Sequence, residues 1–245
     1  MSSTDRQVAK LDRVPLPIEA ARVGATGWQL TRTGARVLCR LAGKGSLSDK
    51  VIREVPQAFA DLGPTYVKLG QIIASSPGAF GEGLSKEFRS LLDSVPPADT
   101  AQVHRLFKEE LGADPAELFA SFDDEPFASA SIAQVHYATL HSGEDVVVKI
   151  QRPGIRRRVA ADLQILKRFA QVAEFAKTGR RLSAKDVVAD FAENLAEELD
   201  FRIEAQSMEA WVSGLHNSPL GRNIMVPDVH WEFTSERVLT MARVE

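Results

Sequence analysis

The sequence predicts an α+β fold, in which a helical first half precedes a small antiparallel sheet with helices packed against it. Apolar residues recur at helical spacing through the first half of the chain. Around residues 131–151 the pattern changes to two strand-like runs joined by a turn. Helical spacing then returns, and a second strand-like pair follows near the last residues. At 245 residues the chain can bury roughly 70% of its unfolded surface, so its core requires no disulfide or metal.

The first half is expected to form helices whose boundaries are given by proline and glycine. Pro56 and the Gly63-Pro64 pair should break the first helical run into pieces. The expected helices are residues 50–75 in pieces, Leu84–Leu92, Thr100–Leu111 ended by Gly112, and a short one opened by Asp114-Pro115.

The second half is expected to hold a hairpin, two long helices and a final strand pair. Residues 141–144 form the turn of the hairpin, and residues 152–154 end its second strand. The expected elements are strands Ser131–Leu140 and Asp145–Gln151, helices of about 155–177 and 184–213, and strands Ile224–Phe233 and Arg237–Val244.

Composition excludes several classes of protein. Cys39 is the single cysteine, which excludes an internal disulfide and favours a reducing compartment. The five histidines show no close metal-ligand pairing, so no metal site is expected in the chain. The net charge of −3 and the lack of interleaved arginine and aromatic residues disfavour a nucleic-acid partner. No apolar run approaches the ~20 residues of a spanning helix, and no signal peptide is evident, so we expect a cytoplasmic protein.

Positive charge is concentrated in residues 1–48, which carry a net charge of +5. Residues 20–48 contain five basic residues and no acidic one. Four of the basic residues recur at intervals of four, namely Arg32, Arg36, Arg40 and Lys44. On a helix they would share one side, which is typical of a peripheral contact with an anionic membrane, here the inner membrane. The alternative is a flexible basic leader, because chain termini are often loosely ordered.

A loop of small residues and a lysine at the end of a strand carry the main chemical signal. The loop, Ala128-Ser129-Ala130-Ser131, leads into the first strand of the hairpin, and the second strand delivers Lys149 after three valines. The N-lobe of a protein kinase has this order: a loop that covers phosphates, then a lysine on the third strand. Taken alone, a lysine at a strand end is more often simply solvated.

Two further groups of polar residues could serve the same site. The candidate partners for Lys149 are Glu197, Glu198, Asp200 and Glu204, although a solvated acidic helix face is the alternative. Upstream, Lys68 and Gln71 lie three residues apart, so both point to one side of a helix. Ordinary surface polarity would explain that second pair equally well.

Together these segments resemble the UbiB/AarF family of atypical kinase-like proteins, which is tied to coenzyme Q biosynthesis. LGPTYVKLGQ is similar to the KxGQ motif of the family, ASASIAQVH to its alanine-rich loop and VVVKIQRPG to its β3 strand. EELDFRIEA is similar to the ExD motif and the following αC glutamate, and VPDVHWEFTSERVLTM to the last strand pair before the hinge. The motifs occur in the family's order from about residue 50 to the last residue.

The resemblance implies a role for each candidate site residue. Lys149 would meet the phosphates of ATP, with Glu204 as its ion-pair partner and residues 128–131 as the loop over the phosphates. Lys68 and Gln71 would belong to a helical extension across the nucleotide site. Two of the other acids, Glu198 and Asp200, would face that extension. The implied cofactor is ATP with Mg²⁺, and an isoprenoid lipid or quinone precursor is a further implied partner.

The resemblance also predicts three parts and exposes two kinds of departure. The parts are a basic leader (residues 1–48), a helical KxGQ extension (residues 49–122) and a kinase-like N-lobe that ends at the hinge (residues 123–245). After KLGQ this chain has Ser76 and Gly78 where the family has arginine and aspartate, which concerns the substrate side of the site. No catalytic-loop or metal-binding aspartate motif follows Lys149, so the C-lobe is expected to be absent.

Two functions remain open at this point. One is the nucleotide-binding N-terminal portion of an atypical kinase or ATPase that supports quinone or isoprenoid-lipid metabolism. The other is a pseudokinase-like module that binds a lipid or a partner without turnover. The chain alone is expected to show no phosphoryl transfer, and the DNA downstream of codon 245 would distinguish a fragment from a natural short form.

Overall fold

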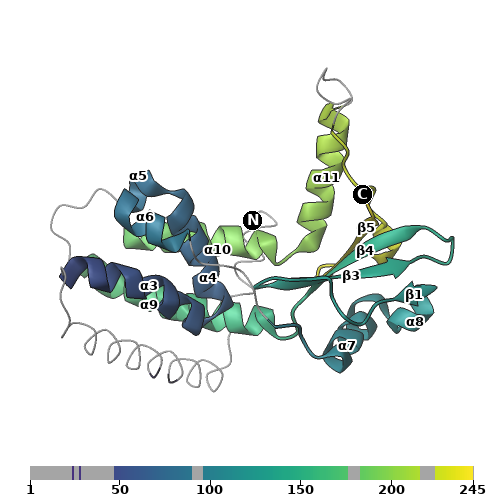
Figure 1. Cartoon of the computed structure of the whole chain (residues 1–245), viewed down its shortest axis with the longest axis horizontal. Helices are drawn as coiled ribbons and strands as arrows, with labels where there is room; N and C mark the ends of the chain where they lie inside the picture. Colours follow the sequence, from purple (N-terminus) through teal and green to yellow (C-terminus); the bar gives the residue numbers. More distant parts are fainter. Residues whose placement is uncertain are drawn as a thin grey trace. The chain divides into compact units, whose positions relative to one another are not determined.

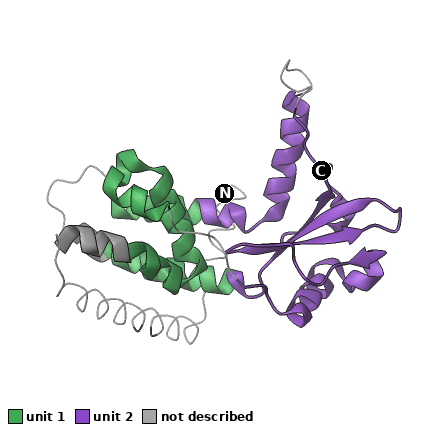
Figure 2. Ribbon diagram, viewed as in Figure 1, with its two compact units in different colours: residues 1–94, 156–193 green, residues 95–155, 194–245 purple. Residues whose placement is uncertain are grey.

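The computed structural model describes residues 24, 28, 47–89, 96–175, 183–215 and 224–244. Packing divides the chain into two compact units (Figure 2): residues 1–94 with 156–193, and residues 95–155 with 194–245. We call them unit 1 and unit 2. The expected division at residues 48 and 122 stays a prediction. The expected membrane contact of residues 20–48 lies outside the described residues, apart from positions 24, 28, 47 and 48.

Unit 1 is built of helices (Figure 1). They are α3 (Leu47–Leu62), α4 (Pro64–Ser75), α5 (Pro77–Phe80), α6 (Glu82–Phe88), α9 (Ile155–Phe175) and the first part of α10 (Ala184–Glu198). A buried hydrogen bond of 2.7 Å, from Thr65 Oγ1 to Asp162 Oδ2, joins α4 to α9. Because both residues are fully buried, this bond fixes how the two helices pack.

Gly63 makes the sharp turn between α3 and α4. Its φ of +108° lies in the region that residues with a Cβ atom rarely adopt. A Cβ atom here would also collide with the guanidinium of Arg158, which donates a hydrogen bond of 3.4 Å to the carbonyl of Leu62. The expected break at Gly63-Pro64 is therefore confirmed.

The expected break at Pro56 is wrong, because α3 continues through this residue. A proline inside a helix removes one backbone hydrogen bond and costs about 3 kcal/mol. Pro56 is buried together with Ala58 and Leu62 on the same helix. The burial of this helix face offsets the cost of the lost backbone hydrogen bond. Because this burial depends on tertiary packing, the sequence pattern alone did not reveal it.

Unit 2 contains an antiparallel sheet in which the strand order is β1-β3-β4-β5, with β2 also paired to β3. The strands are β1 (Ser121–Phe122), β2 (Ala128–Ser129), β3 (Ala133–Thr139), β4 (Asp145–Gln151) and β5 (Val238–Ala242). β4 lies between β3 and β5, so both of its edges are paired. This central place makes β4 the most rigid support for a functional side chain in unit 2.

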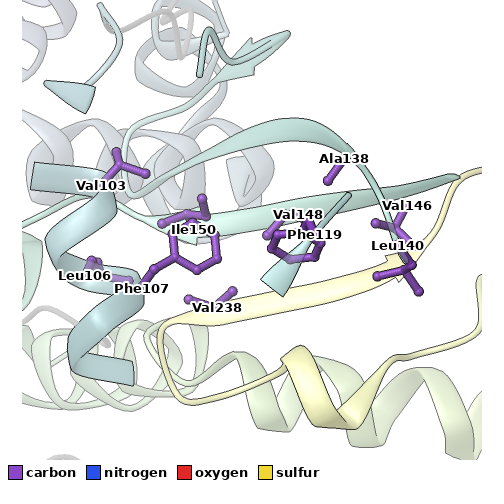
Figure 3. Close-up of a cluster of buried hydrophobic side chains, with 10 residues drawn as sticks. All are labelled: Val103, Leu106, Phe107, Phe119, Ala138, Leu140, Val146, Val148, Ile150 and Val238. Carbon is purple, nitrogen blue, oxygen red and sulfur yellow. The ribbon is translucent and has the colours of Figure 1, made fainter. Parts of the chain in front are cut away.

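Alternation along β4 separates two packed faces. Val146, Val148 and Ile150 are fully buried on one face (Figure 3), where α7 (Thr100–Leu111) packs with Phe107 among its contacts. The other face carries a second cluster, in which Phe201 of α11 (Phe201–Leu215) packs on the sheet. α7 and α11 thus cover opposite faces of the sheet (Figure 1).

Several helices were predicted correctly from local signals in the sequence. α7 has the predicted bounds, because Asp99 caps its start and Gly112, with φ of +79°, closes its end. The Asp99 carboxylate accepts a hydrogen bond of 3.2 Å from the amide of Gln102. The predicted short helix is α8 (Pro115–Leu118). The predicted α+β class, with a helical part and a small antiparallel sheet, is confirmed.

Two predicted elements are wrong. The helix expected over 184–213 is two helices, α10 and α11, because Asp200 ends the first and caps the second. The strand expected over Ile224–Phe233 forms one bridge, from Val229 to Met241, and then a 3-10 turn, η2 (Trp231–Phe233). Beyond that bridge, the hydroxyl of Thr234 accepts the amide proton of Thr240 at 3.1 Å and replaces a strand partner.

Candidate functional site

Lys149 forms an ion pair with Glu204 between β4 and α11. Its Nζ lies 2.8 Å from Oε1 and 2.7 Å from Oε2 of Glu204. The ammonium also lies 4.9 Å from the ring centre of Phe201, within the range of a cation–π contact. The pair is the one expected from the sequence, and Glu204 projects from a helix packed on the sheet. Both side chains keep partial contact with solvent, with 26% and 42% of their surface exposed.

The start of α11 fixes the position of Glu204. Asp200 Oδ1 accepts hydrogen bonds from the backbone amide of Arg202 at 3.1 Å and from its Nε at 2.8 Å. The amide of Phe201 donates to the carbonyl of Glu236 at 3.1 Å. Because these bonds set the first turn of the helix, the carboxylate of Glu204 is held in that turn, where the helix dipole favours negative charge.

Gln151 is a supporting residue that the sequence did not reveal. It lies on β4 two residues after Lys149 and is fully buried. Its Nε2 donates to the carbonyl of Leu199 at 2.7 Å and to that of Glu236 at 3.1 Å. Both acceptors are main-chain atoms, so no residue pattern pointed to this contact. The strand that carries Lys149 therefore also holds the junction between α10 and α11.

The small-residue loop expected at Ala128–Ser131 consists of β2 (Ala128–Ser129) and the first two residues of the tight turn into β3. Ala128 pairs with Val135 and Ser129 with Gln134 in the antiparallel ladder. The amide of Ala130 donates to the carbonyl of Ala133 at 2.8 Å and closes the turn. Because the side chains of alanine and serine are short, another molecule can approach the backbone of this segment closely.

Asp200 has a partner other than Lys149. Its Oδ2 lies 2.7 Å from Arg202 Nη2, and 3% of its side chain is exposed. The hydrogen bond with Asp200 raises the pKa of the Arg202 guanidinium. Glu198, at the last turn of α10, is half-buried. Among the four candidate acids, the structure pairs Lys149 with Glu204, the partner that the resemblance implied.

Lys68 and Gln71 lie on α4 in unit 1, and both are half-buried. Their expected position opposite Glu198 and Asp200 concerns residues of both units, so it stays a prediction. In the described ranges, no three His, Cys, Asp or Glu side chains gather into a group suited to a metal ion. Across the same residues, no helix combines the length and apolarity needed to cross a membrane.

Residues 90–245 match the family model of the ABC1 atypical kinase-like domain. The chain belongs to this family. Among its relatives is an uncharacterized protein of Mycobacterium tuberculosis, 79% identical over 243 residues, which cover 99% of this chain and 50% of the relative. The probable protein kinase UbiB of Azotobacter vinelandii is 42% identical over 188 residues, which cover 76% of this chain and 34% of that protein.

Solved structures agree with the ABC1 assignment. A Mycobacterium tuberculosis protein solved as a complex with erythromycin matches with a TM-score of 0.53 and 27% identity. The match covers 89% of this chain and 50% of that protein. The predicted resemblance to the UbiB family and the kinase-like fold are thereby confirmed. The chain spans about half the length or less of the relatives it matches.

Proposed function

We propose that this chain is the nucleotide-binding portion of an atypical UbiB-type kinase or ATPase that uses ATP with Mg²⁺. The observation that carries the proposal is the Lys149–Glu204 pair between a central strand and a covering helix. In kinases, a lysine on such a strand meets the α- and β-phosphates, and a helix carboxylate keeps it in place. The membership in the ABC1 family supports the same assignment.

The residues present fit the phosphate groups of a nucleotide. An ammonium group has three donors, and two oxygens of Glu204 lie within 2.8 Å of Lys149 Nζ, which leaves donor capacity for a phosphate oxygen. Residues 128–131 supply a backbone with short side chains for close approach. ATP would supply the phosphoryl group, while the lysine neutralises charge and the carboxylate orients the lysine.

Three further assignments complete the proposal. Lys68 and Gln71 lie across the nucleotide site, opposite Glu198 and Asp200. The acceptor or lipid partner is an isoprenoid lipid or quinone precursor, in keeping with the relatives described as probable protein kinase UbiB. Residues 20–48 contact the membrane peripherally through their basic side chains.

The second candidate is a pseudokinase-like module that binds a ligand without turnover. The observation that favours it is the relative from Mycobacterium tuberculosis that was solved in complex with erythromycin. In this module the Lys149–Glu204 pair would keep α11 in place, and phosphoryl transfer would not occur.

Calorimetry with Mg-ATP tests the first proposal on the protein expressed from its complete reading frame. We expect Lys149→Met to weaken binding about tenfold or more, the equivalent of about 1.4 kcal/mol. Lys185→Met, which changes an exposed lysine of α10, should bind as the unchanged protein does. Equal affinity of all three proteins contradicts the nucleotide site. Binding without release of ADP over hours supports the pseudokinase-like module.

A further inference from the structure

Arg152 follows β4 directly and makes three side-chain hydrogen bonds, two of which reach the small-residue loop. Its Nε donates to the carbonyl of Ala130 at 2.7 Å. Its Nη2 donates to the hydroxyl of Ser129 at 2.6 Å and to the carbonyl of Pro96 at 2.7 Å. The backbone amide of Arg152 donates to the carbonyl of Ile132 at 2.9 Å. One residue therefore holds both sides of the turn between β2 and β3.

Within the loop, Ser131 is buried, whereas the side chains of Ala128–Ala130 contribute little packing that would fix the shape of this segment. Ala128 is exposed, and Ser129 and Ala130 are only partly buried. Alanine and serine side chains bury little apolar surface, so packing contributes little at these positions. A guanidinium, in contrast, offers several donors in a rigid plane, and its bonds carry a formal charge. Arg152 therefore supplies side-chain anchors for the loop at Ser129 and Ala130, in addition to the β2–β3 ladder.

We propose that Arg152 is a positioning residue that pins the Ser129–Ala130 segment to the end of β4 and thereby sets the affinity of the site for nucleotide phosphates. The second part rests on the proposed function. Lys149 and Arg152 lie three residues apart on the same chain segment, so the pin keeps the loop in register with the lysine. The loop then meets the phosphates as a fixed surface and does not have to be ordered when nucleotide binds.

Hydrogen exchange tests the pin without any nucleotide, on the protein expressed from its complete reading frame. The reporter is the amide of Ala130, which donates to the carbonyl of Ala133, in a peptide covering residues 127–134. We expect exchange in this peptide to be about tenfold faster in Arg152→Gln. Arg157→Gln, at an exposed position of α9, is the matched control and should exchange as the unchanged protein does. Equal protection in both variants overturns the pin.

A double-mutant cycle locates the effect at Ser129. Ser129→Ala removes one acceptor of the guanidinium, so it should speed exchange by a smaller factor than Arg152→Gln. Added to Arg152→Gln, it should have no further effect, because the shared bond is already lost. Independent, additive effects of the two substitutions contradict a pin that acts through this hydroxyl.

Arg152→Lys separates geometry from charge. An ammonium keeps the positive charge but does not reproduce the planar fork that reaches Ala130 and Ser129 together. We expect it to loosen the loop and to weaken Mg-ATP binding about tenfold, as Arg152→Gln does, a change of about 1.4 kcal/mol. Full affinity in Arg152→Lys, together with weakened binding in Arg152→Gln, contradicts the role of the pin in nucleotide binding and indicates that Arg152 acts on phosphate through its charge.

The two readouts distinguish failure of this inference from failure of the proposed function. A loosened loop with unchanged ATP affinity overturns the functional part of the inference. A loosened loop in a protein that binds no ATP even without substitution supports the pin, refutes its nucleotide role and refutes the proposed function. The thermal unfolding midpoints of the three arginine variants serve as the control for folding. Midpoints within about 4 °C of the unchanged protein show that loss of folding does not cause the faster exchange or the weaker binding.

Discussion

The Lys149–Glu204 pair contributes more to the position of the Lys149 ammonium than to the stability of the fold. Ion pairs with side chains this exposed contribute about 1 kcal/mol or less to the free energy of unfolding. The same pair keeps the ammonium of Lys149, which projects from the central strand β4, beside the ring of Phe201. A substitution here should therefore affect ligand binding and leave folding nearly unchanged, which makes the two effects separable.

Glu204→Gln provides that separation. We expect it to weaken Mg-ATP binding about tenfold, because an amide does not hold the ammonium by charge. The thermal midpoint should move by about 2–4 °C or less. Glu232→Gln, an exposed glutamate of η2, is the control with the same chemical change. If Glu204→Gln bound ATP like the control, Lys149 would not need its partner.

At the scale of elements, α11 is the part whose start matters most for the site. Asp200 gives the helix its cap, and the carbonyl of Glu236 receives the amide of Phe201. Gln151 holds the same junction from the sheet. Since Glu204 lies in the first turn, any loosening of this start moves its carboxylate away from Lys149.

Substitutions of Asp200 test the cap. Asp200→Ala should lower the free energy of unfolding by about 1–2 kcal/mol, the usual cost of losing a capping side chain. Asp200→Asn keeps an oxygen that accepts the amide of Arg202, so it should lose less. Urea unfolding measures both, and hydrogen exchange of the first turn of α11 localises the effect. Equal losses in the two variants would show that the charge on Asp200, and not the cap, stabilises the helix.

The contrast between α7 and α11 shows which elements a sequence reveals. α7 carries its own start and stop signals, Asp99 and Gly112, within a few residues of its ends. The start of α11 also has a local cap, Asp200, but it depends in addition on partners from β4 and from the turn before β5, which are distant in sequence. β1 and β2 have two residues each, too short for an alternating pattern to show.

Some residues of the candidate site were likewise predictable from local sequence signals, and others were not. Lys149 was predictable because a valine run marks its strand, and the residues alone narrowed its carboxylate partner to four acids. Only the family resemblance pointed to Glu204 among them, because a contact between residues 55 positions apart leaves no local pattern in the sequence. Gln151 and Arg152 escaped prediction because nearly all of their acceptors are main-chain carbonyls, which exist at every residue.

At the scale of the whole molecule, a glutamate joins α7 to the start of β5. Glu110 Oε2 accepts from the Ser235 hydroxyl at 2.6 Å, and its Oε1 accepts from Arg237 Nε at 2.7 Å. Burial raises the pKa of Glu110, but the hydrogen bonds from Ser235 and Arg237 outweigh it and hold the pKa below its ordinary value. This contact therefore stabilises unit 2 above about pH 4.5 and is lost as the pH falls through the lowered value.

His136 on β3 makes the stability of unit 2 depend on pH in a second way. Its ring stacks against the ring of Phe122. Its Nδ1 lies 2.7 Å from the carbonyl of Asp123, so this nitrogen donates, and its Nε2 lies 2.7 Å from Gln134 Nε2, so that nitrogen accepts. The arrangement requires a neutral ring. Burial, the largest cause, lowers the pKa of His136 below its ordinary value.

These two groups predict a two-stage loss of stability on acidification. Below about pH 6.5 the unfolded chain binds a proton at His136 that the folded chain does not, so the free energy of unfolding falls by at most about 1.4 kcal/mol per pH unit. A second fall, from Glu110, begins below about pH 4.5. Hydrogen exchange of the β4 amides from about pH 3 to 8, corrected for intrinsic rates, measures the free energy of unfolding of unit 2. His136→Asn should remove the first stage only, and His141→Asn, at an exposed turn, should keep both. A first stage that persists in His136→Asn would assign it to another group, since no buried neutral ring would remain at position 136 to account for it.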